Sequence, residues 1–471
     1  MLFNSFEFIF VFLPLCLLLY FGLNRFGQYK LAKGVLVLFS LYFYAFFNWS
    51  YLPIIITSIL INYAISTGLK ISGEPLKRKI FLSAGLLFNI GLLGYFKYYD
   101  FFISNMNIIF QSNFTLKHIL LPLGISFFTF QQIAFVIDSY YRRVTMPSFL
   151  DYCNFVTFFP QLIAGPIVLP EEMLPQFEEK SNRTPNYKNI FDGIFIFGIG
   201  LAKKVIIADS IAVFANAGFD GDMVSYTFLE AWLISIAYTM QLYFDFSGYC
   251  DMAIGIGRMF NISLPLNFNI PYIAANFREF WRRWHMTLNR FLTQYLYIPL
   301  GGNRKGELRT HMNTMVVFGV SGLWHGAGWT FIIWGLLHGG GVIISKLWKN
   351  HGFKLPRFVA VGITFVCVNI LWVIFRADSL GRAWLIIKSM FNNLSFKLTS
   401  DFTSNLPSIF PNKFNMALLA IAIILSLFGP SGYMLMTEYR KPRVKIVATA
   451  VLITCGIILL NRISTFLYFN F

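Results

Sequence analysis

The chain has 471 residues, of which 56% are hydrophobic and only 13% are charged, and its mean hydropathy is +0.62. This balance excludes an ordinary soluble globular protein and indicates an integral protein of the lipid bilayer. The formal net charge of +17 would suit nucleic acid binding, but the basic residues flank apolar runs and leave no soluble domain for such a fold, so we expect no nucleic acid partner.

Apolar runs long enough to cross about 30 Å of hydrocarbon, at roughly 20 residues per helix, recur along the chain. They lie near residues 7–24, 32–49, 51–68, 80–96, 119–137, 190–208, 227–244, 312–345, 357–375, 415–433 and 445–461. The run 312–345 is long enough for one long helix or for two closely packed helices. The sequence therefore predicts an all-α polytopic membrane protein with about ten to twelve transmembrane helices.

The short loops between the first runs predict the orientation of the chain. They contain three basic clusters: Arg25, Lys30 and Lys33; Lys70, Lys77, Arg78 and Lys79; and Arg142 with Arg143. Because cytoplasmic loops carry the excess of Lys and Arg, these loops are expected in the cytoplasm and the amino terminus outside. The amino-terminal stretch has no basic region and no small-residue cleavage site, so it is expected to be a retained first span.

The organisation of the chain is expected to be simple. Neither an internal repeat nor a low-complexity linker divides it, so we expect a single membrane-embedded domain over residues 1–471, with the most motif-rich core at 241–345. The polar stretch 171–189 is expected to be a loop. Five well-separated cysteines (Cys16, Cys153, Cys250, Cys367 and Cys455) predict neither a disulfide framework nor a metal site.

The middle of the chain, residues 241–311, mixes apolar and ionisable residues in a way that no lipid-facing helix tolerates. Its ionisable residues include Asp245, Asp251, Arg258, Arg278, Glu279, Arg282, Arg283, His285 and Arg290, and its helix breakers are Pro265, Pro271, Pro299, Gly301 and Gly302. This pattern predicts short re-entrant or interfacial helices, and the proline-rich stretch 158–170 is likewise expected to be broken. Non-helical backbone at membrane depth must be buried in protein or line a cavity, so the sequence predicts a cavity.

One histidine stands out in an apolar run. His325 lies in SGLWHGAGW, residues 321–329, where glycines are expected to leave the backbone unobstructed and Trp324 and Trp329 to wall the imidazole, as in a tunnel. A neutral imidazole can take a proton from a hydroxyl group. The alternative is a structural histidine bonded to a backbone carbonyl, but an ionisable residue inside a membrane favours function.

Two other histidines are more ambiguous. His338, in GLLHGGG, is expected to be structural. His285 ends REFWRRWH, where Trp281 would share its helical face while Arg282 and Arg283 point elsewhere. An amphipathic interfacial helix with aromatic anchors explains that pattern without any chemistry.

Two acidic residues in YFDFSGYCDMAIG also have two interpretations. Asp245 and Asp251 are either buried partners of nearby arginines, which the sequence favours, or an acid or orienting group for a histidine. Motifs of serine hydrolases, P-loop nucleotide-binding proteins, zinc proteases and dinucleotide-binding enzymes are absent from the sequence.

Taken together, these stretches carry a family resemblance. The segments from QLYFDFSGYCDMAIGIGRMF to YLYIPLGGNRKG, then SGLWHGAGW, with FFPQLIAGPI at 158–167 and LWVIFRAD at 371–378, resemble the membrane-bound O-acyltransferase (MBOAT) family over nearly the whole chain. DFSGYCDMAIG and YIPLGGNRKG favour the bacterial branch of alginate O-acetyltransferase (AlgI) and the related peptidoglycan and cellulose O-acetylation proteins. Thr287, where many relatives have serine, is a small departure.

The resemblance implies a fold and a reaction. The fold would be a ring of helices, with re-entrant and interfacial helices, around a thinned centre with a tunnel. The reaction would move acetyl from cytoplasmic acetyl-CoA, a donor substrate and not a bound cofactor, toward extracytoplasmic polysaccharide hydroxyls. A separate secreted SGNH-type acetylesterase-like partner would complete the transfer, since the chain leaves no room for that soluble domain.

The resemblance also assigns roles to residues of this chain. His325 would be the catalytic general base and His285 a second functional position nearer the cytoplasmic mouth. Donor binding is expected from Arg278, Arg282, Arg283, Arg304 and Lys305, which suit phosphate groups, together with Trp281 and Trp324, while Asp245 and Asp251 would support the site.

Two other functions stay open at this point. The first is D-alanyl transfer to teichoic acid, which would use a carrier-protein donor. The second is a polysaccharide or lipid transporter in which the buried charges mark a conduction path. The absence of repeat symmetry counts weakly against the transporter.

Overall fold

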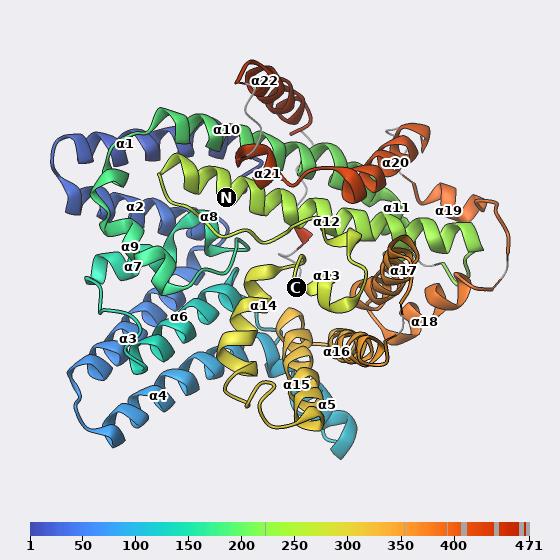
Figure 1. The fold of residues 1–471 in the computed structure, drawn as a ribbon, viewed down its shortest axis with the longest axis horizontal. Coiled ribbons are helices and arrows are strands. Elements are labelled where there is room, and N and C mark those ends of the chain that lie inside the picture. The colour runs from blue at the N-terminus through green and yellow to red at the C-terminus, as the bar shows by residue number, and fades with distance from the viewer. Residues whose placement is uncertain are drawn as a thin grey trace. The chain divides into compact units, whose positions relative to one another are not determined.

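The structure is a computed structural model that describes residues 1–221, 223–352, 354–392, 394–406, 412–437, 442–460 and 466–467. Over this part of the chain the secondary structure is helical (Figure 1). The residues form two compact units, each assembled from separate stretches of sequence. The first comprises Met1–Gly198, Tyr249–Pro265 and Arg443–Thr449, and the second comprises Ile199–Gly248, Leu266–Pro442 and Ala450–Phe471.

The first unit begins with the long helices of the amino-terminal part. Its elements are η1 (Phe8–Phe12), α1 (Leu13–Arg25), α2 (Tyr29–Ala45), η2 (Trp49–Tyr51), α3 (Leu52–Ile71), α4 (Pro75–Leu93), η3 (Gly94–Tyr98), α5 (Tyr99–Phe110), α6 (Ile125–Tyr140), α7 (Phe149–Thr157), α8 (Phe159–Leu162), α9 (Pro170–Glu178) and η4 (Lys180–Arg183). Prolines in the first turn start α1, α3 and α4, where the missing N–H removes no hydrogen bond. Helices α3, α4 and α6 contact one another (Figure 1).

Three helices have residues in both units: α10 (Tyr187–Ala202), α12 (Phe228–Met259) and α22 (Pro442–Ile458). The other elements of the second unit are η5 (Lys203–Ala208), α11 (Asp209–Phe219), η6 (Pro271–Ile273), α13 (Phe277–Trp281), α14 (Met286–Leu292), η7 (Thr293–Tyr297), α15 (Glu307–His325), α16 (Trp329–Asn350), α17 (Arg357–Arg376), α18 (Leu380–Ser389), α19 (Ser400–Ser404), α20 (Asn412–Phe428) and α21 (Gly432–Thr437). Helices α15 and α16 form the most extensive helix pair of this unit.

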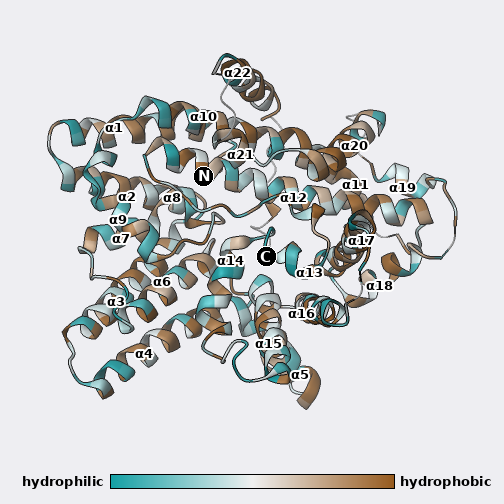
Figure 2. Ribbon diagram, viewed as in Figure 1, coloured by the Kyte–Doolittle hydropathy of each residue, from teal (hydrophilic) through white to brown (hydrophobic). Residues whose placement is uncertain are grey.

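Five helical segments of the described chain are long and apolar enough to cross a membrane: Phe8–Arg25, Trp49–Ile71, Pro75–Phe110, Trp329–Asn350 and Arg357–Arg376. Large apolar side chains on them are exposed, among them Leu18 (72%), Leu87 (71%) and Ile363 (52%), as expected of surfaces that contact lipid. Figure 2 shows the hydrophobic character of α17 beside the hydrophilic α13. Each predicted apolar run overlaps a helix, although residues 119–124 precede α6 and the end of the run 445–461 lies outside the described residues; the run 312–345 divides into α15 and α16. A total of ten to twelve spans stays a prediction.

Several buried polar side chains of the first unit pair with one another. Asn62 and Asn89 hydrogen-bond through their side chains, and Gln132 donates to the Ser58 hydroxyl at 2.8 Å. Lys33 forms an ion pair with Asp151. Polar groups that leave water must find such partners, so the amide and hydroxyl contacts orient α3, α4 and α6 toward each other, and the ion pair joins α2 to α7.

The structure confirms two predictions about the backbone and contradicts a third. The stretch 158–170 is broken, since only the four-residue α8 is helical before α9 begins at Pro170. Residues 271–297 form short helices, as expected. The predicted loop 171–189 was wrong in its first half: Pro170–Glu178 is a helix, because Met173, Leu174 and Phe177 share one buried face.

The predicted continuous helix through REFWRRWH is also wrong. Helix α13 ends at Trp281, and His285 has a left-handed backbone, with φ of 43°, before α14 begins. Trp281 and His285 therefore do not share a helical face, and the side chain of His285 is aimed independently of the arginines that precede it.

Candidate active site

The side chain of His325 is held at the end of a helix. It is the last residue of α15 and is 4% exposed. Its Nδ1 lies 2.6 Å from the carbonyl oxygen of Ser321, one turn earlier. Because a carbonyl oxygen only accepts, Nδ1 carries the proton, and in a neutral ring the lone pair belongs to Nε2. The basic atom of His325 is therefore Nε2.

Aromatic rings surround the imidazole of His325. The centroids of Trp324, Trp334 and Phe375 lie 4.9, 5.0 and 5.6 Å from that of His325. Trp324 was predicted here, and Trp329, the other predicted wall residue, is 55% exposed at the start of α16. The sequence did not single out Trp334, which lies more than a helical turn further along α16 and is fully buried.

The glycines around His325 serve close packing. A Cβ at Gly322 would lie 2.3 Å from the carbonyl oxygen of Phe331, and one at Gly335 would lie 2.3 Å from that of Phe318. A Cβ at Gly326 would lie 2.2 Å from the Phe331 ring. The expected unobstructed backbone is thus wrong: these glycines let α15 and α16 approach until their backbones touch.

His285 is the second histidine of the site. It is fully buried, its Nδ1 lies 3.1 Å from Asn267 Oδ1, and its ring centroid lies 6.3 Å from that of His325. The rings of Phe246 and Trp324, at 4.9 and 6.0 Å, also pack against it. The structure therefore brings together the two histidines that the sequence singled out, although the sequence placed His285 on the wrong kind of element.

Asn267 is a positioning residue that the sequence analysis missed. Its Oδ1 accepts from the Thr287 hydroxyl at 2.9 Å and from the Thr287 N–H at 3.3 Å, as well as from His285. Such an acceptor fixes the proton of His285 on Nδ1 and leaves the lone pair on Nε2. His285 lies outside the membrane-spanning segments, and burial, followed by the neighbouring His325, holds its pKa well below the usual value, so the ring is neutral at pH 7.

Substitution of Asn267 by leucine removes an acceptor while keeping nearly the same shape. We expect a loss of about 1–3 kcal/mol in stability, because the buried donors of His285 and Thr287 lose their partner. The kcat should fall by more than the loss of folded protein explains, because the proton of His285 is no longer fixed on Nδ1. Asn267→Asp, which still accepts, should restore most of the kcat. Equal loss of kcat in both variants, each measured on folded protein, would contradict this role.

His338 extends the aromatic wall toward an open cleft. Its Nδ1 accepts from Trp281 Nε1–H at 3.2 Å, so Nε2 carries the proton, and Nε2 has no hydrogen-bond partner among the described residues. Its ring lies 4.8 Å from Trp334 and 5.4 Å from Phe277. Ring contacts thus run from Phe277 through His338 and Trp334 to His325.

Phe277 also lines a cleft of about 1,330 Å³ in the second unit. The polar and charged residues of its lining are Asn269, Asn276, Arg278, Glu279, Arg282, Arg283, Ser345, Lys349, Lys354 and Thr364. Five of these are cations and one is an acid, so the cleft attracts anions. Its volume exceeds that of typical small-molecule pockets and accommodates a ligand of cofactor size.

Glu279 organises the positive residues of the cleft. It accepts from Arg283 and Arg357, each at 3.2 Å, and from the N–H of Ala275 at 2.9 Å. Burial alone would raise its pKa, but the Ala275 N–H and the two guanidinium groups outweigh burial and hold the pKa below its usual value. Arg278 and Arg282 are exposed, which leaves their charges directed to a ligand or to solvent.

The remaining predicted site residues lie elsewhere. Arg304 and Lys305 are exposed in the turn before α15 and do not line the cleft, and Trp281 packs against His338. Asp245 pairs with Lys204 at 2.7 Å, so the expected arginine partner was wrong. Asp251 is buried in the first unit, at 5% exposed.

Known proteins are similar to this chain over much of its length. The model of the membrane-bound O-acyltransferase family matches residues 41–377. A peptidoglycan O-acetyltransferase of Helicobacter pylori is 44% identical, with the alignment covering all of this chain and 98% of that relative. A probable alginate O-acetylase, AlgI, of Pseudomonas aeruginosa is 39% identical over 90% of this chain and 81% of its own length.

A more distant similarity extends to a teichoic acid D-alanyltransferase of Streptococcus thermophilus, which is 26% identical over 56% of this chain and 70% of that relative. The family match spans both histidines, the walls around them and most of the cleft. Together with the full-length similarity, it shows that the chain belongs to the membrane-bound O-acyltransferase family and is a multi-pass membrane O-acyltransferase.

Proposed function

We propose that this protein transfers acetyl from acetyl-CoA toward hydroxyl groups of an extracytoplasmic polysaccharide, with His325 as the general base. The observation that carries the proposal is the contact of His325 Nδ1 with the Ser321 carbonyl, because it leaves the basic lone pair on Nε2 in a buried site next to His285. The similarity to the peptidoglycan and alginate O-acetylation proteins supports acetyl as the group and a polysaccharide as the acceptor.

The proposed donor site is the cleft of the second unit. Its exposed cations, Arg278, Arg282, Lys349 and Lys354, suit the phosphate groups of coenzyme A. The ring contacts through Phe277, His338 and Trp334 lead from the cleft to His325. We propose that the thioester follows this direction, through a tunnel of the kind that the family resemblance implies, with Trp281 and Trp324 as parts of its wall.

The proposed step balances as a simple acyl transfer. Nε2 of His325 takes the proton of the acceptor hydroxyl while the oxygen attacks the thioester carbonyl. The C–S bond then breaks, the imidazolium returns its proton to the leaving sulfur, and free coenzyme A departs. A general base typically contributes about 10²- to 10⁴-fold in rate, and positioning adds to this. His285 would orient the thioester or assist the proton transfer. A covalent acetyl-histidine intermediate is the alternative course.

The proposed topology places donor and acceptor on opposite faces. The basic loops around Lys30, Lys77 and Arg142 would face the bacterial cytoplasm and the amino terminus would face outward. Acetyl would leave on the outer face, where an SGNH-type partner would complete transfer to the polymer.

The donor cleft can be tested through its charges. The double variant Arg278→Ala/Arg282→Ala should raise the KM for acetyl-CoA by about 10-fold or more with little change in kcat, because the phosphate contacts are lost while the reacting groups stay in place. The measurement is thioester consumption as a function of donor concentration at two salt concentrations. Arg309→Ala, an exposed cation outside the cleft lining, is the matched control. An unchanged KM in the double variant would show that the donor binds elsewhere.

The function itself is tested by the choice of donor. Purified protein in liposomes would receive labelled acetyl-CoA or a D-alanyl carrier protein, and label would be followed in the thioester and in external acceptor. Consumption of acetyl-CoA alone supports the proposal. Turnover of the D-alanyl carrier alone would select teichoic acid D-alanylation. Movement of polysaccharide or lipid without thioester loss would select the transporter, which the family membership disfavours.

A further inference from the structure

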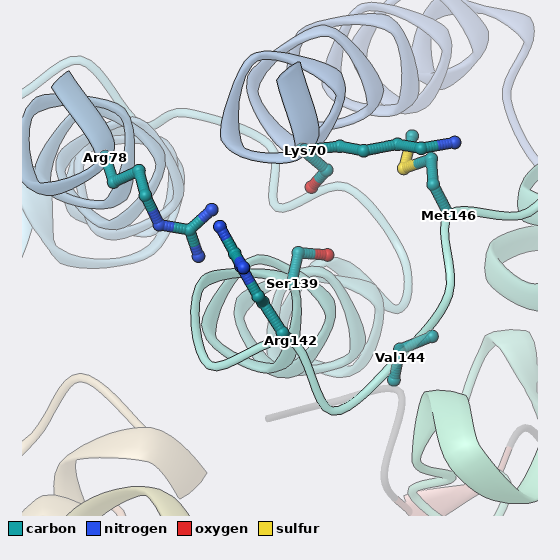
Figure 3. Close-up of a pocket in the computed structure, with 7 residues that line it drawn as sticks. Lys70, Arg78, Ser139, Arg142, Val144 and Met146 are labelled. Atoms are coloured by element: carbon teal, nitrogen blue, oxygen red, sulfur yellow. The ribbon is translucent and has the colours of Figure 1, made fainter. Parts of the chain in front are cut away.

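A small basic cavity lies in the first unit, at the ends of α3 and α6 and the start of α4. Its volume is about 110 Å³, and it is lined by Ser66, Lys70, Arg78, Ser139, Arg142, Val144 and Met146 (Figure 3). Three of these residues are cations and none is an acid. The cavity is much smaller than the roughly 300 Å³ at which pockets for drug-sized ligands begin, so it suits a compact anion and excludes a nucleotide.

Arg78 forms the fixed wall of this cavity. Arg78 is 8% exposed. Its guanidinium donates to the backbone carbonyls of Leu69 and Tyr140, in the last turns of α3 and α6. These contacts use two of its five N–H groups and hold the side chain in place. Helix carboxyl ends offset part of its charge, but no carboxylate among the described residues pairs with it.

The acids nearest to Lys70 and Arg142 form their ion pairs with other cations. The nearby acids Glu74 and Asp138 pair with Lys77 and Arg143, and neither of these cations lines the cavity. In Figure 3 the side chains of Arg78 and Arg142 point toward one another. Two guanidinium groups that share a cavity without an acid repel each other, and an anion between them would remove that cost.

The backbone of Arg142 and the hydroxyl of Ser66 point to the same conclusion independently. Arg142 has a φ of 57°, the left-handed conformation after a helix end that glycine usually takes. Ser66 is fully buried, and its hydroxyl has no hydrogen-bond partner among the described residues. A buried hydroxyl without a partner costs about 1–3 kcal/mol, so this group is suited to a polar ligand in the cavity.

We propose that this cavity binds one phosphate group, held by the guanidinium groups of Arg78 and Arg142 with a hydrogen bond from the Ser66 hydroxyl. Lys70, whose side chain extends away from the two guanidinium groups in Figure 3, adds positive charge to the lining. The phosphate belongs either to the headgroup of an anionic phospholipid or to inorganic phosphate. Lys70, Arg78 and Arg142 belong to the basic clusters that the positive-inside pattern predicts at the cytoplasmic face. Anionic phospholipid and inorganic phosphate both occur at that face. The site is separate from the donor cleft, which belongs to the other unit.

The test compares two pairs of cations in the full-length protein. Lys70→Gln/Arg142→Gln removes one ligand and a second positive charge of the lining, and Lys77→Gln/Arg143→Gln removes the same charge from neighbours outside the lining. Arg78 is left intact, because its contacts to two helix ends bear on folding. Retention of phosphatidylglycerol is measured by native mass spectrometry after extraction from phosphatidylglycerol–phosphatidylcholine vesicles. Inorganic phosphate is added to protein in pure phosphatidylcholine, with chloride at equal ionic strength as the reference.

If the source is lipid, wild type retains phosphatidylglycerol, and the site variant loses retention by roughly 30-fold while the control pair keeps it. If the source is inorganic phosphate, phosphate raises the Tm of wild type and of the control pair but not of the site variant. Equal weakening by both pairs shows only general attraction between basic loops and anions and overturns the proposal. Absence of any effect in both arms also overturns it.

Discussion

His325→Gln is expected to abolish thioester consumption while the protein stays folded. Glutamine keeps a donor that can reach the Ser321 carbonyl, so the end of α15 retains its local hydrogen bond. The amide, however, has no basic lone pair at the position of Nε2. The rate should fall by at least about 10²- to 10⁴-fold, the usual contribution of a general base, and by more if acetyl is carried covalently on the ring. The measurement is release of free coenzyme A from acetyl-CoA by purified protein.

His351→Gln is a matched control for this experiment. The Nδ1 of His351 makes the same contact, to the carbonyl of Leu347 one turn earlier at 2.9 Å, but this residue is exposed at the end of α16. The control shows whether the loss of activity comes from removing any histidine at a helix end or from removing the buried His325 in particular. If His325→Gln turns over normally at unchanged thermal stability, the histidine is structural and the general base lies elsewhere.

Lys204→Met is expected to produce the largest loss of stability outside the site. Lys204 is 1% exposed and forms ion pairs of 2.7 Å with both Asp209 and Asp245. Removing the lysine leaves two carboxylates near each other with their cation gone, and breaking a buried pair in this way costs about 3–5 kcal/mol. The loss is measured as a lower Tm of the detergent-solubilised protein and as a lower yield of folded protein.

The control for this variant is Lys388→Met, which removes an exposed lysine of α18 in the same unit. Its Tm should stay close to that of wild type, because exposed charges contribute little. The triple variant Lys204→Met/Asp209→Asn/Asp245→Asn removes the charges together and should recover part of the loss. A Tm of Lys204→Met equal to that of wild type would mean that the buried ion pairs contribute no net stability.

The sequence predicted the helices well because membrane helices are a local property. Apolar runs of sufficient length, proline positions and the broken stretch 158–170 all follow from the chemistry of neighbouring residues. The helix Pro170–Glu178 was missed because polarity was judged over the whole stretch 171–189, although Met173, Leu174 and Phe177 already had helical spacing.

The site was predicted in part. His325 and His285 were identified because ionisable residues in apolar surroundings are rare. Their contacts could not be derived, because Asn267 reaches His285 across 18 residues and Lys204 reaches Asp245 between two different helices. Nothing in the local pattern identifies Trp334 as a neighbour of His325, since this depends on how α15 packs against α16.

The backbone contact between α15 and α16 has a consequence for engineering the enzyme. With Gly322 and Gly335 in contact, neither position can take a larger side chain without forcing α15 and α16 apart. The rings of Trp334 and Phe375 pack against His325 without such a backbone contact, so they are the replaceable part of its surroundings. A change in the length of the acyl group that the enzyme accepts should therefore come from trimming these rings, while substitution of either glycine should cost stability.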